Sequence, residues 1–214
     1  FGLVIDTKLS NINLIGDPTE NSVVYFTSTN SPNTASVGGL VGALWKMENV
    51  ADSTLMEGAT VKNVHVAGKA YCDKKNTDDT YDIYVGGAVG VFGNPKGGTQ
   101  KITKVNVDNC VVDAIGEKTM LPYAGGVVAG MWWSSTTQLS YAIVKNSAIT
   151  STSIVPSAYA GGIVGLMQCS TVDHCLTQDT EVKAVSEQSN AYAGGIAARG
   201  KNGTESITYC YSNA

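Results

Sequence analysis

The nine residues from Ala160 to Gln168 read AGGIVGLMQ, and closely similar stretches occur at four other places in the chain. Each stretch has two glycines followed by a short apolar run. The copies are VGGLVGALW from Val37, VGGAVGVFG from Val85, AGGVVAGMW from Ala124, AGGIVGLMQ from Ala160 and AGGIAARGK from Ala193. Their glycine pairs begin 48, 39, 36 and 33 residues apart. A motif that returns at this spacing indicates a repeat architecture.

A second motif alternates with the glycine motif along the chain. Its copies are LSNINL from Leu9, VKNVHV from Val61, VDNCVV from Val107, VKNSAI from Val144, VDHCLT from Val172 and ITYCYS from Ile207. Apolar and polar residues alternate in them, which is typical of a half-buried β-strand. Two motifs that alternate along the chain indicate one structural unit in about six copies.

The pattern favours β-structure over the helical and propeller repeats. Val, Ile, Thr, Tyr and Gly dominate the repeats, no stretch has a convincing 3.6-residue period, and a propeller blade would need four strands per repeat. Unequal intervals indicate coils that share core strands and differ in their loops. The sequence therefore predicts an all-β fold, a right-handed single-stranded parallel β-helix (β-solenoid) of about six irregular coils. We expect one domain over residues 1–214. Because neither end resembles a cap, we also expect the chain to be a segment of a longer surface protein.

Stacked coils place equivalent residues in columns about 4.8 Å apart, and the alignment predicts several columns. The residues two places before the glycine pairs form the column Tyr84, Tyr123, Tyr159, Tyr192. The residues six places after the first glycine form the column Leu44, Phe92, Met131, Met167, with Arg199 one place short of it. The fourth places of the second motif form the column Val64, Cys110, Ser147, Cys175, Cys210. The paired glycines suit a bulge or a sharp corner.

The five cysteines follow from the same alignment. An odd number leaves at least one thiol unpaired or shared with another chain. Cysteine behaves as a small hydrophobic residue when buried, so we expect free thiols in the interior. A disulfide between Cys175 and Cys210, in neighbouring coils, is the alternative.

Composition limits the partners. The net charge is -4 and Arg199 is the single arginine, which argues against nucleic acid, because phosphate binding needs clustered Lys and Arg. The longest apolar run, from Tyr123 to Trp133, is too short for a membrane span and contains three glycines. The N-terminal residues FGLVIDTKLS lack the pattern of a signal peptide.

The combination of VGGLVG, AGGIVG and the closing GTESITYCYSNA resembles the GLUG repeat family, over nearly the whole chain. The resemblance implies a bacterial protein at the cell surface or secreted, such as an adhesin or the stalk of an immunoglobulin A peptidase. It implies non-catalytic architecture, and the repeat carries over no catalytic residue. Copies such as VVAG from Val127 and IAAR from Ile196 depart from the motif.

Several charged or metal-binding combinations have a simpler structural interpretation. Lys62, Asp108, Lys145 and Asp173 share a predicted column whose alternating charges suit cross-strand ion pairs. The stretch CDKKNTDDTYD, which contains Asp73, Asp78, Asp79 and Asp82, lacks the spacing of a calcium loop. A metal site at His174 with its neighbouring cysteines is disfavoured, because His174 occupies the turn position of the second motif. We therefore predict no catalytic residues, no metal and no cofactor.

The tryptophans are the candidate binding residues. Trp45 and Trp132 fall in one column, seven places after the first glycine, and Trp133 follows directly. Exposed aromatic rings can stack on sugars, whereas large aromatics are more often buried. The sequence predicts a structural or adhesive segment whose partner is a glycan or a host surface protein. The alternative is a β-helix enzyme that degrades polysaccharides, a lyase or a glycoside hydrolase.

Overall fold

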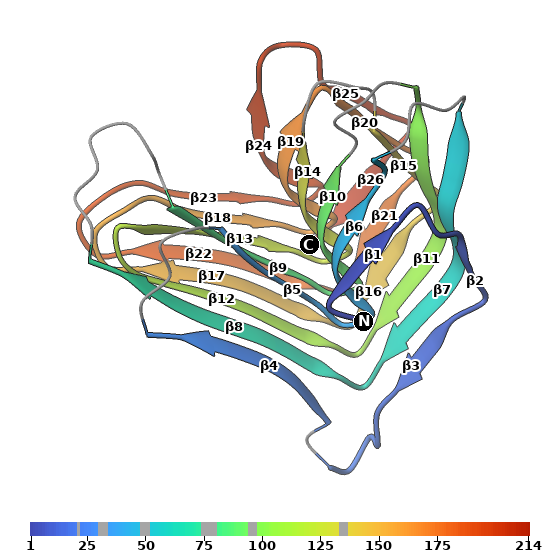
Figure 1. The fold of residues 1–214 in the computed structure, drawn as a ribbon. Helices are drawn as coiled ribbons and strands as arrows, with labels where there is room; N and C mark the ends of the chain where they lie inside the picture. Colours follow the sequence, from blue (N-terminus) through green and yellow to red (C-terminus); the bar gives the residue numbers. More distant parts are fainter. Residues whose placement is uncertain (21, 30–33, 48–51, 74–80, 94–97, 133–136) are drawn as a thin grey trace.

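The structure is a computed structural model that describes residues 1–20, 22–29, 34–47, 52–73, 81–93, 98–132 and 137–214 (Figure 1). Within these ranges all helix and strand assignments are strands, in four sheets. The strand pairs run parallel. The predicted all-β class with parallel strands is confirmed.

The four sheets are named A to D. Sheet A contains β1 (Leu3–Ile5), β6 (Val41–Trp45), β10 (Val89–Gly93), β14 (Val128–Trp132), β19 (Val164–Gln168) and β24 (Ala197–Lys201). Sheet B contains β2 (Leu9–Ser10), β3 (Asn13–Ile15), β7 (Ser53–Lys62), β11 (Gln100–Asp108), β15 (Thr137–Ser140), β16 (Ile143–Lys145), β20 (Ser170–Asp173), β21 (Leu176–Gln178), β25 (Ser206–Thr208) and β26 (Tyr211–Asn213). Sheet C contains β4 (Val23–Ser28), β8 (His65–Cys72), β12 (Val111–Lys118), β17 (Ala148–Ser153) and β22 (Glu181–Ser186). Sheet D contains β5 (Ala35–Gly38), β9 (Tyr81–Gly86), β13 (Met120–Gly125), β18 (Ala158–Gly161) and β23 (Ala191–Gly194).

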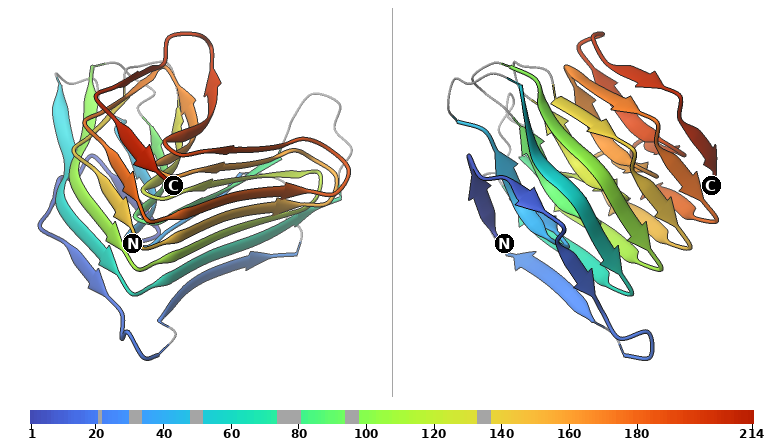
Figure 2. Two further views of the ribbon diagram at one scale, coloured as in Figure 1. Left: turned by 180° about the vertical axis from the view of Figure 1, so that it is seen from behind. Right: turned by 90° about the vertical axis from the view of Figure 1, so that its right-hand side faces the viewer.

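The chain visits these sheets in a fixed order. It runs from sheet B to C, then to D and A, and then returns to B; we call one such circuit a pass. The described residues make five complete passes, from β2 to β24, and each strand lies beside its equivalent in the next pass (Figures 1 and 2). This repeated order is compatible with the predicted β-helix.

The four sheets form two arms that meet at an angle (Figures 1 and 2). Sheets C and D lie against each other in one arm, and sheets A and B lie against each other in the other. The main core fills both arms; Val112, Ile83, Phe92 and Ile102, one from each sheet, are all fully buried in it. The turn from D to A, at the glycine pairs, is the inside corner of this shape. The turn from B to C is the outer corner.

The glycine pairs allow the backbone at the inside corner to lie close to backbone atoms of the same and of the next pass. A Cβ at Gly125 would overlap the carbonyl oxygen of Val128, and one at Gly126 would overlap the carbonyl oxygen of Gly162 in the next pass. The same Cβ at Gly126 would lie 2.9 Å from Cγ2 of Val144, at the outer corner. Neither glycine has a positive φ. The inside corner therefore requires glycine because there is no space for a side chain.

Both columns predicted around the glycine motif are confirmed. The register pairs Tyr84 with Tyr123, Tyr123 with Tyr159, and Tyr159 with Tyr192. It also pairs Leu44 with Phe92, Phe92 with Met131, and Met131 with Met167. Gly200 continues the apolar column, and Arg199 stands one place before it, as the alignment predicted. The strand β19 is buried at four of its five positions, as expected for a parallel strand covered on both faces.

The predicted column of the second motif is confirmed for Val64, Cys110 and Ser147, but Cys175 and Cys210 form a separate column, because the copies belong to two different turns. Val144 pairs with Thr177, not with Val172. Val172 instead pairs with Leu139 and with Ile207. Cys110 therefore aligns with the outer corner, whereas Cys175 and Cys210 align with an earlier turn within sheet B. The copy at Leu9 belongs to that earlier turn too, since Leu9 pairs with Met56.

Both turns contain residues in the left-handed region, which explains why the sequence confuses them. At the outer corner these residues are Asn63, Asn109, Asn146 and Asp179, with φ of 56°, 51°, 50° and 47°. At the sheet B turn they include Lys104, Tyr141, His174 and Tyr209, with φ of 58°, 54°, 48° and 49°. The turn role predicted for His174 is confirmed, although it does not share a column with the asparagines.

The cysteines are free thiols, as expected. Cys72, Cys110 and Cys175 are buried, while Cys169 and Cys210 are partly exposed. Cys175 and Cys210 do lie in neighbouring passes, where the backbone N–H of Cys175 donates to Sγ of Cys210 at 3.3 Å. Burial raises the pKa of the Cys175 thiol to about 12. Among the residues that the structure describes, no helix has the length and apolar character needed to cross a membrane.

Candidate functional site

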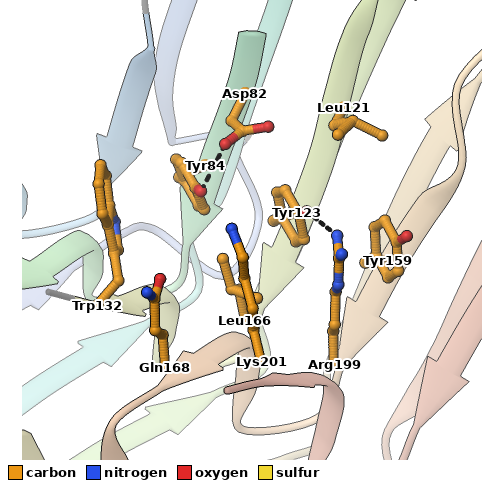
Figure 3. A pocket seen from close by; sticks show the side chains of 10 residues that line it. All are labelled: Asp82, Tyr84, Leu121, Tyr123, Trp132, Tyr159, Leu166, Gln168, Arg199 and Lys201. Carbon is orange, nitrogen blue, oxygen red and sulfur yellow. Dashed lines mark hydrogen bonds between the residues drawn. The ribbon is translucent and has the colours of Figure 1, made fainter. Parts of the chain in front are cut away.

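A cavity of about 440 Å³ lies in the inside corner, between the outer faces of sheets D and A (Figure 3). One wall comes from sheet D and the other from sheet A. The lining residues are Asp82, Tyr84, Leu121, Tyr123, Trp132, Tyr159, Leu166, Gln168, Arg199 and Lys201. The cavity therefore combines aromatic, charged and amide side chains from four successive passes.

The tyrosine column forms the wall on sheet D. Successive rings are stacked, with centroids 5.0 Å apart for Tyr84 and Tyr123, 4.8 Å for Tyr123 and Tyr159, and 5.1 Å for Tyr159 and Tyr192. Tyr84 and Tyr123 are only 1% and 2% exposed. Neighbouring rings cover the faces of Tyr123, so it presents a ring edge and a hydroxyl group to the cavity, not a face on which a sugar could stack.

The wall on sheet A comes from two adjacent columns. Trp132, Gln168 and Lys201 occupy the position seven places after the first glycine of their copies, and Gln168 pairs directly with Lys201. Leu166 and Arg199 pair in the column two places earlier. Residues two apart on a strand point to the same face, so both columns face sheet D. The sequence alignment that placed Trp132 in a column could also have named Gln168 and Lys201.

Arg199 is held in a defined orientation by two members of the tyrosine column. Its Nη1 donates a hydrogen bond of 2.8 Å to the hydroxyl oxygen of Tyr123. The guanidinium carbon also lies 5.1 Å from the centre of the Tyr159 ring, within the range of a cation–π contact. The Tyr123 hydroxyl accepts from Arg199, which leaves its own hydrogen available to a ligand.

Asp82 is the carboxylate of the cavity. The Tyr84 hydroxyl donates to Oδ2 of Asp82 at 2.9 Å, and Oδ1 is buried without a hydrogen-bond partner among the described residues. Burial raises the pKa of Asp82 to about 6, although the Tyr84 hydrogen bond and the charges of Lys201 and Arg199 oppose that rise. Burial and the nearby Asp82 also raise the pKa of Tyr84 well above its usual value.

The predicted tryptophan column is confirmed, and it reaches the cavity at one of its members. Gly93 pairs with both Trp45 and Trp132, so the two indoles lie on either side of a glycine. Their ring centroids are 6.2 Å apart in an edge-on arrangement. Trp132 lines the cavity, and both rings are partly buried against the cluster around Tyr84. Trp133 lies outside the described residues.

The charged column is confirmed for three of its four predicted members. Asp108 lies between two lysines, 3.3 Å from Nζ of Lys62 and 3.8 Å from Nζ of Lys145. Asp173 does not belong to this column, because it pairs with Ser140 and Thr208 at the sheet B turn. It accepts hydrogen bonds from His174 at 2.7 Å and from the Thr208 hydroxyl at 2.6 Å.

The other candidates do not assemble into a site. The described residues contain no group of three His, Cys, Asp or Glu side chains able to hold a metal ion. Asp78 and Asp79 of the acidic stretch lie outside the described residues. Asp73, from the same stretch, forms an ion pair with Lys118, and Asp82 faces the cavity.

Comparison with known proteins adds no relative: no family model matches the chain, and neither does any curated protein or solved structure. The candidate site consequently rests on its own geometry. Its polar members, Asp82, Gln168, Arg199 and Lys201, were not predicted as binding residues, although the last three stand at fixed distances after the first glycine of their copies.

Proposed function

We propose that this chain is a right-handed β-solenoid and a non-catalytic segment of a secreted or surface-anchored bacterial protein, and that its inside corner binds a glycan. The repeated passes through four sheets and the stacked columns support the solenoid. The likeness of the glycine motif to GLUG repeats supports the surface location. The host surface protein remains the other partner class, to be tested against the same cavity.

The cavity is the observation that carries the glycan proposal. It places the Tyr123 hydroxyl and amide, guanidinium and ammonium groups beside the indole of Trp132 and the ring edges of the tyrosine column. Saccharides present hydroxyl groups that accept and donate hydrogen bonds, together with apolar C–H faces. The exposed lining of the cavity is more polar than apolar, which suits a ligand rich in hydroxyl groups.

The same geometry argues against catalysis. Glycoside hydrolysis ordinarily uses two carboxyl groups on either side of the bond that breaks, and Asp82 is the one carboxylate among the described lining residues. A tyrosine that acts as a base needs a lowered pKa, whereas burial raises the pKa of Tyr84 and of Tyr123. A ligand in this cavity would contact groups that bind it. Asp82 is the one described lining residue whose pKa would let it act as a base near neutral pH.

Asp82 is also the one observation that favours the alternative, a polysaccharide-degrading enzyme. A carboxyl group with a raised pKa, buried in a cavity, is a common feature of active sites. The two functions differ in what happens to the bound saccharide, so a single sample can be assayed for both.

The test is to measure binding of a panel of acidic and neutral oligosaccharides by calorimetry, and then to assay the same mixtures for new chain ends. We expect saturable binding with no new ends, and weaker binding after Trp132→Ala. The matched control is Tyr25→Ala, which removes an exposed aromatic residue of sheet C, 59% exposed and outside the cavity. New chain ends that disappear in Asp82→Asn would replace the scaffold proposal with the enzyme.

A further inference from the structure

We propose that the inside-corner cavity selects a saccharide that carries a carboxylate, and that Arg199 and Lys201 bind this carboxylate. The inference rests on the proposed glycan-binding function and names the class of glycan. Both residues line the cavity and lie on β24, two positions apart, so their side chains project from the same face of sheet A (Figure 3).

These two cations differ from most others in the described part of the chain, because neither forms an ion pair with a carboxylate there. Lys46 lies 3.1 Å from a carboxylate oxygen of Asp6, and Lys69 lies 2.8 Å from one of Glu117. Arg199 and Lys201, in contrast, share the cavity with Asp82, and no ion pair joins either of them to it within the described residues. The cavity therefore holds two cationic groups and one partly buried acid.

Arg199 is prepared for a planar anion. The Tyr123 hydroxyl engages one of its nitrogens at 2.8 Å and the Tyr159 ring lies 5.1 Å from the guanidinium carbon, so the group is oriented before any ligand enters. A guanidinium has five N–H donors in a rigid fork that matches a carboxylate, and fixing it in advance lowers the entropy lost on binding.

Lys201 and Gln168 extend the site along the stack. They pair across β19 and β24, so an amide stands beside the ammonium group. Lys201 supplies a mobile point charge, and Gln168 can accept from one sugar hydroxyl and donate to another. Asp82, on the opposite wall, would repel a second anionic group at that side. The arrangement fits one carboxylate per bound residue, as in a uronic or a sialic acid.

The experiment compares acidic probes with neutral counterparts on the same protein. Trigalacturonate is compared with trigalactose, and sialyllactose with lactose, by calorimetry at low and moderate salt. We expect at least one acidic probe to bind about tenfold or more tightly than its neutral counterpart, with a difference that shrinks as salt rises. Lys201→Gln is expected to remove most of this preference.

The matched control is Lys183→Gln. Lys183 is an exposed lysine on β22 of the last complete pass, it forms no ion pair among the described residues, and it lies outside the cavity. Lys183→Gln removes the same charge as Lys201→Gln but outside the cavity, so this variant should keep the preference for acidic probes. Arg199→Gln, like Lys201→Gln, is expected to lose that preference. The melting temperature of Arg199→Gln shows whether only a contact or the folded structure has been lost. Lys201 is exposed, so Lys201→Gln tests the site even where Arg199→Gln is unstable.

Equal binding of acidic and neutral probes, or an unchanged preference in Lys201→Gln, would overturn the inference and leave the glycan proposal standing. Binding of none of the four probes, while a neutral glycan of another class binds, would do the same. Absence of binding to every saccharide would overturn both. Equally tight competition by a short polyglutamate peptide would show that the site recognises carboxylates on proteins, and would overturn the saccharide inference.

Discussion

The inside corner and the outer corner turn the same chain in every pass, but they use different chemistry. At the inside corner the chain turns at Gly125 and Gly126 and their equivalents, where a side chain would overlap backbone atoms. At the outer corner the four later complete passes turn at Asn63, Asn109, Asn146 and Asp179, whose φ lies near 50° and whose side chains are exposed or partly exposed. One corner requires the absence of a side chain, and the other requires a left-handed backbone conformation.

The difference has consequences for how each corner tolerates sequence change. Steric exclusion leaves a single residue type at each glycine of the inside corner. A left-handed conformation is easiest for Gly, Asn and Asp, and the outer corner uses Asn and Asp, but the comparable turn in sheet B also adopts it with Lys, Tyr and His. The inside corner is therefore the more constrained of the two, and it is also the corner that forms the cavity.

The largest expected effect comes from filling the inside corner. In Gly126→Val the new side chain would meet the backbone carbonyl oxygen of Gly162 and the fully buried side chain of Val144. We expect a loss of stability on the order of 3 kcal/mol or more, with reduced soluble yield. Chemical denaturation followed by circular dichroism measures it.

Gly2→Ala provides the control, because nothing lies within 4 Å of a Cβ at Gly2. It should change the free energy of unfolding by less than about 0.5 kcal/mol. A Gly126→Val protein as stable as Gly2→Ala would show that the inside corner can open, and would remove the steric distinction between the corners.

The second prediction concerns Asp82, beside the inside corner. Its native pKa of about 6 lies above the value of about 3.9 expected in the unfolded chain, so the native state binds the proton more tightly. Its contribution to stability is full below about pH 4 and is lost as the pH rises through 6. Relative to Asp82→Asn, which stays neutral, the wild type should lose about 2 kcal/mol between pH 4 and pH 7.

Melting temperatures of the two proteins across this range provide the measurement. Asparagine keeps an acceptor for the Tyr84 hydroxyl, so the local hydrogen bond is preserved in the variant. A constant difference between the two proteins from pH 4 to pH 7 would mean that Asp82 titrates as it does in water, and that the inside corner does not exclude solvent from it.

The contrast between the corners also explains what the sequence could predict. The glycine motif aligned correctly in all five copies, and with it the tyrosine and tryptophan columns, because a position that admits only glycine leaves a clear pattern. The second motif mixed two turns, because Asn109 and His174 both stand at left-handed positions after similar apolar residues. Only the register, which pairs Val144 with Thr177, separates them.

The candidate site was predicted in part for the same reason. The sequence predicts Trp132 as a binding residue because it is a large aromatic residue, but it does not predict Gln168 and Lys201 in the same column, since polar residues on a strand are ordinarily solvated. Their importance comes from the angle between sheets A and D, which turns an outer face into a cavity wall (Figure 1). The columns follow from the repeat, but this angle does not.

The third prediction tests the outer corner through its backbone. In Asn109→Ala the backbone must still adopt a φ near 51°, which is unfavourable for alanine. The variant also loses the hydrogen bond of 2.9 Å that Nδ2 of Asn109 donates to Asn63. We expect a loss of about 1 to 2 kcal/mol. Asn109→Gly relieves the backbone cost and still loses the hydrogen bond, so it should lie between Asn109→Ala and the wild type. A glycine variant less stable than the alanine variant would contradict the left-handed turn.

The smallest effect is expected at Asp108, whose carboxylate contrasts with Asp82. Burial tends to raise the pKa of Asp108, but hydrogen bonds from Asn146 and Lys62 and the charge of Lys145 outweigh it, so the pKa is lowered. Its contribution to stability is therefore present above about pH 4 and is lost as the pH falls through the lowered native value, opposite in sign to that of Asp82.

Asp108→Asn should accordingly cost about 1 kcal/mol at pH 7, because the side chains of both lysines are only partly buried and the amide can still accept one hydrogen bond. The deficit should shrink as the pH falls below 4, whereas the effect of Asp82→Asn is largest near neutral pH. Denaturation of both variants at pH 3 and pH 7 distinguishes them. An Asp108→Asn deficit that is equal at the two pH values would assign the role of Asp108 to packing instead of charge, and would remove the opposite pH dependence expected at the two corners.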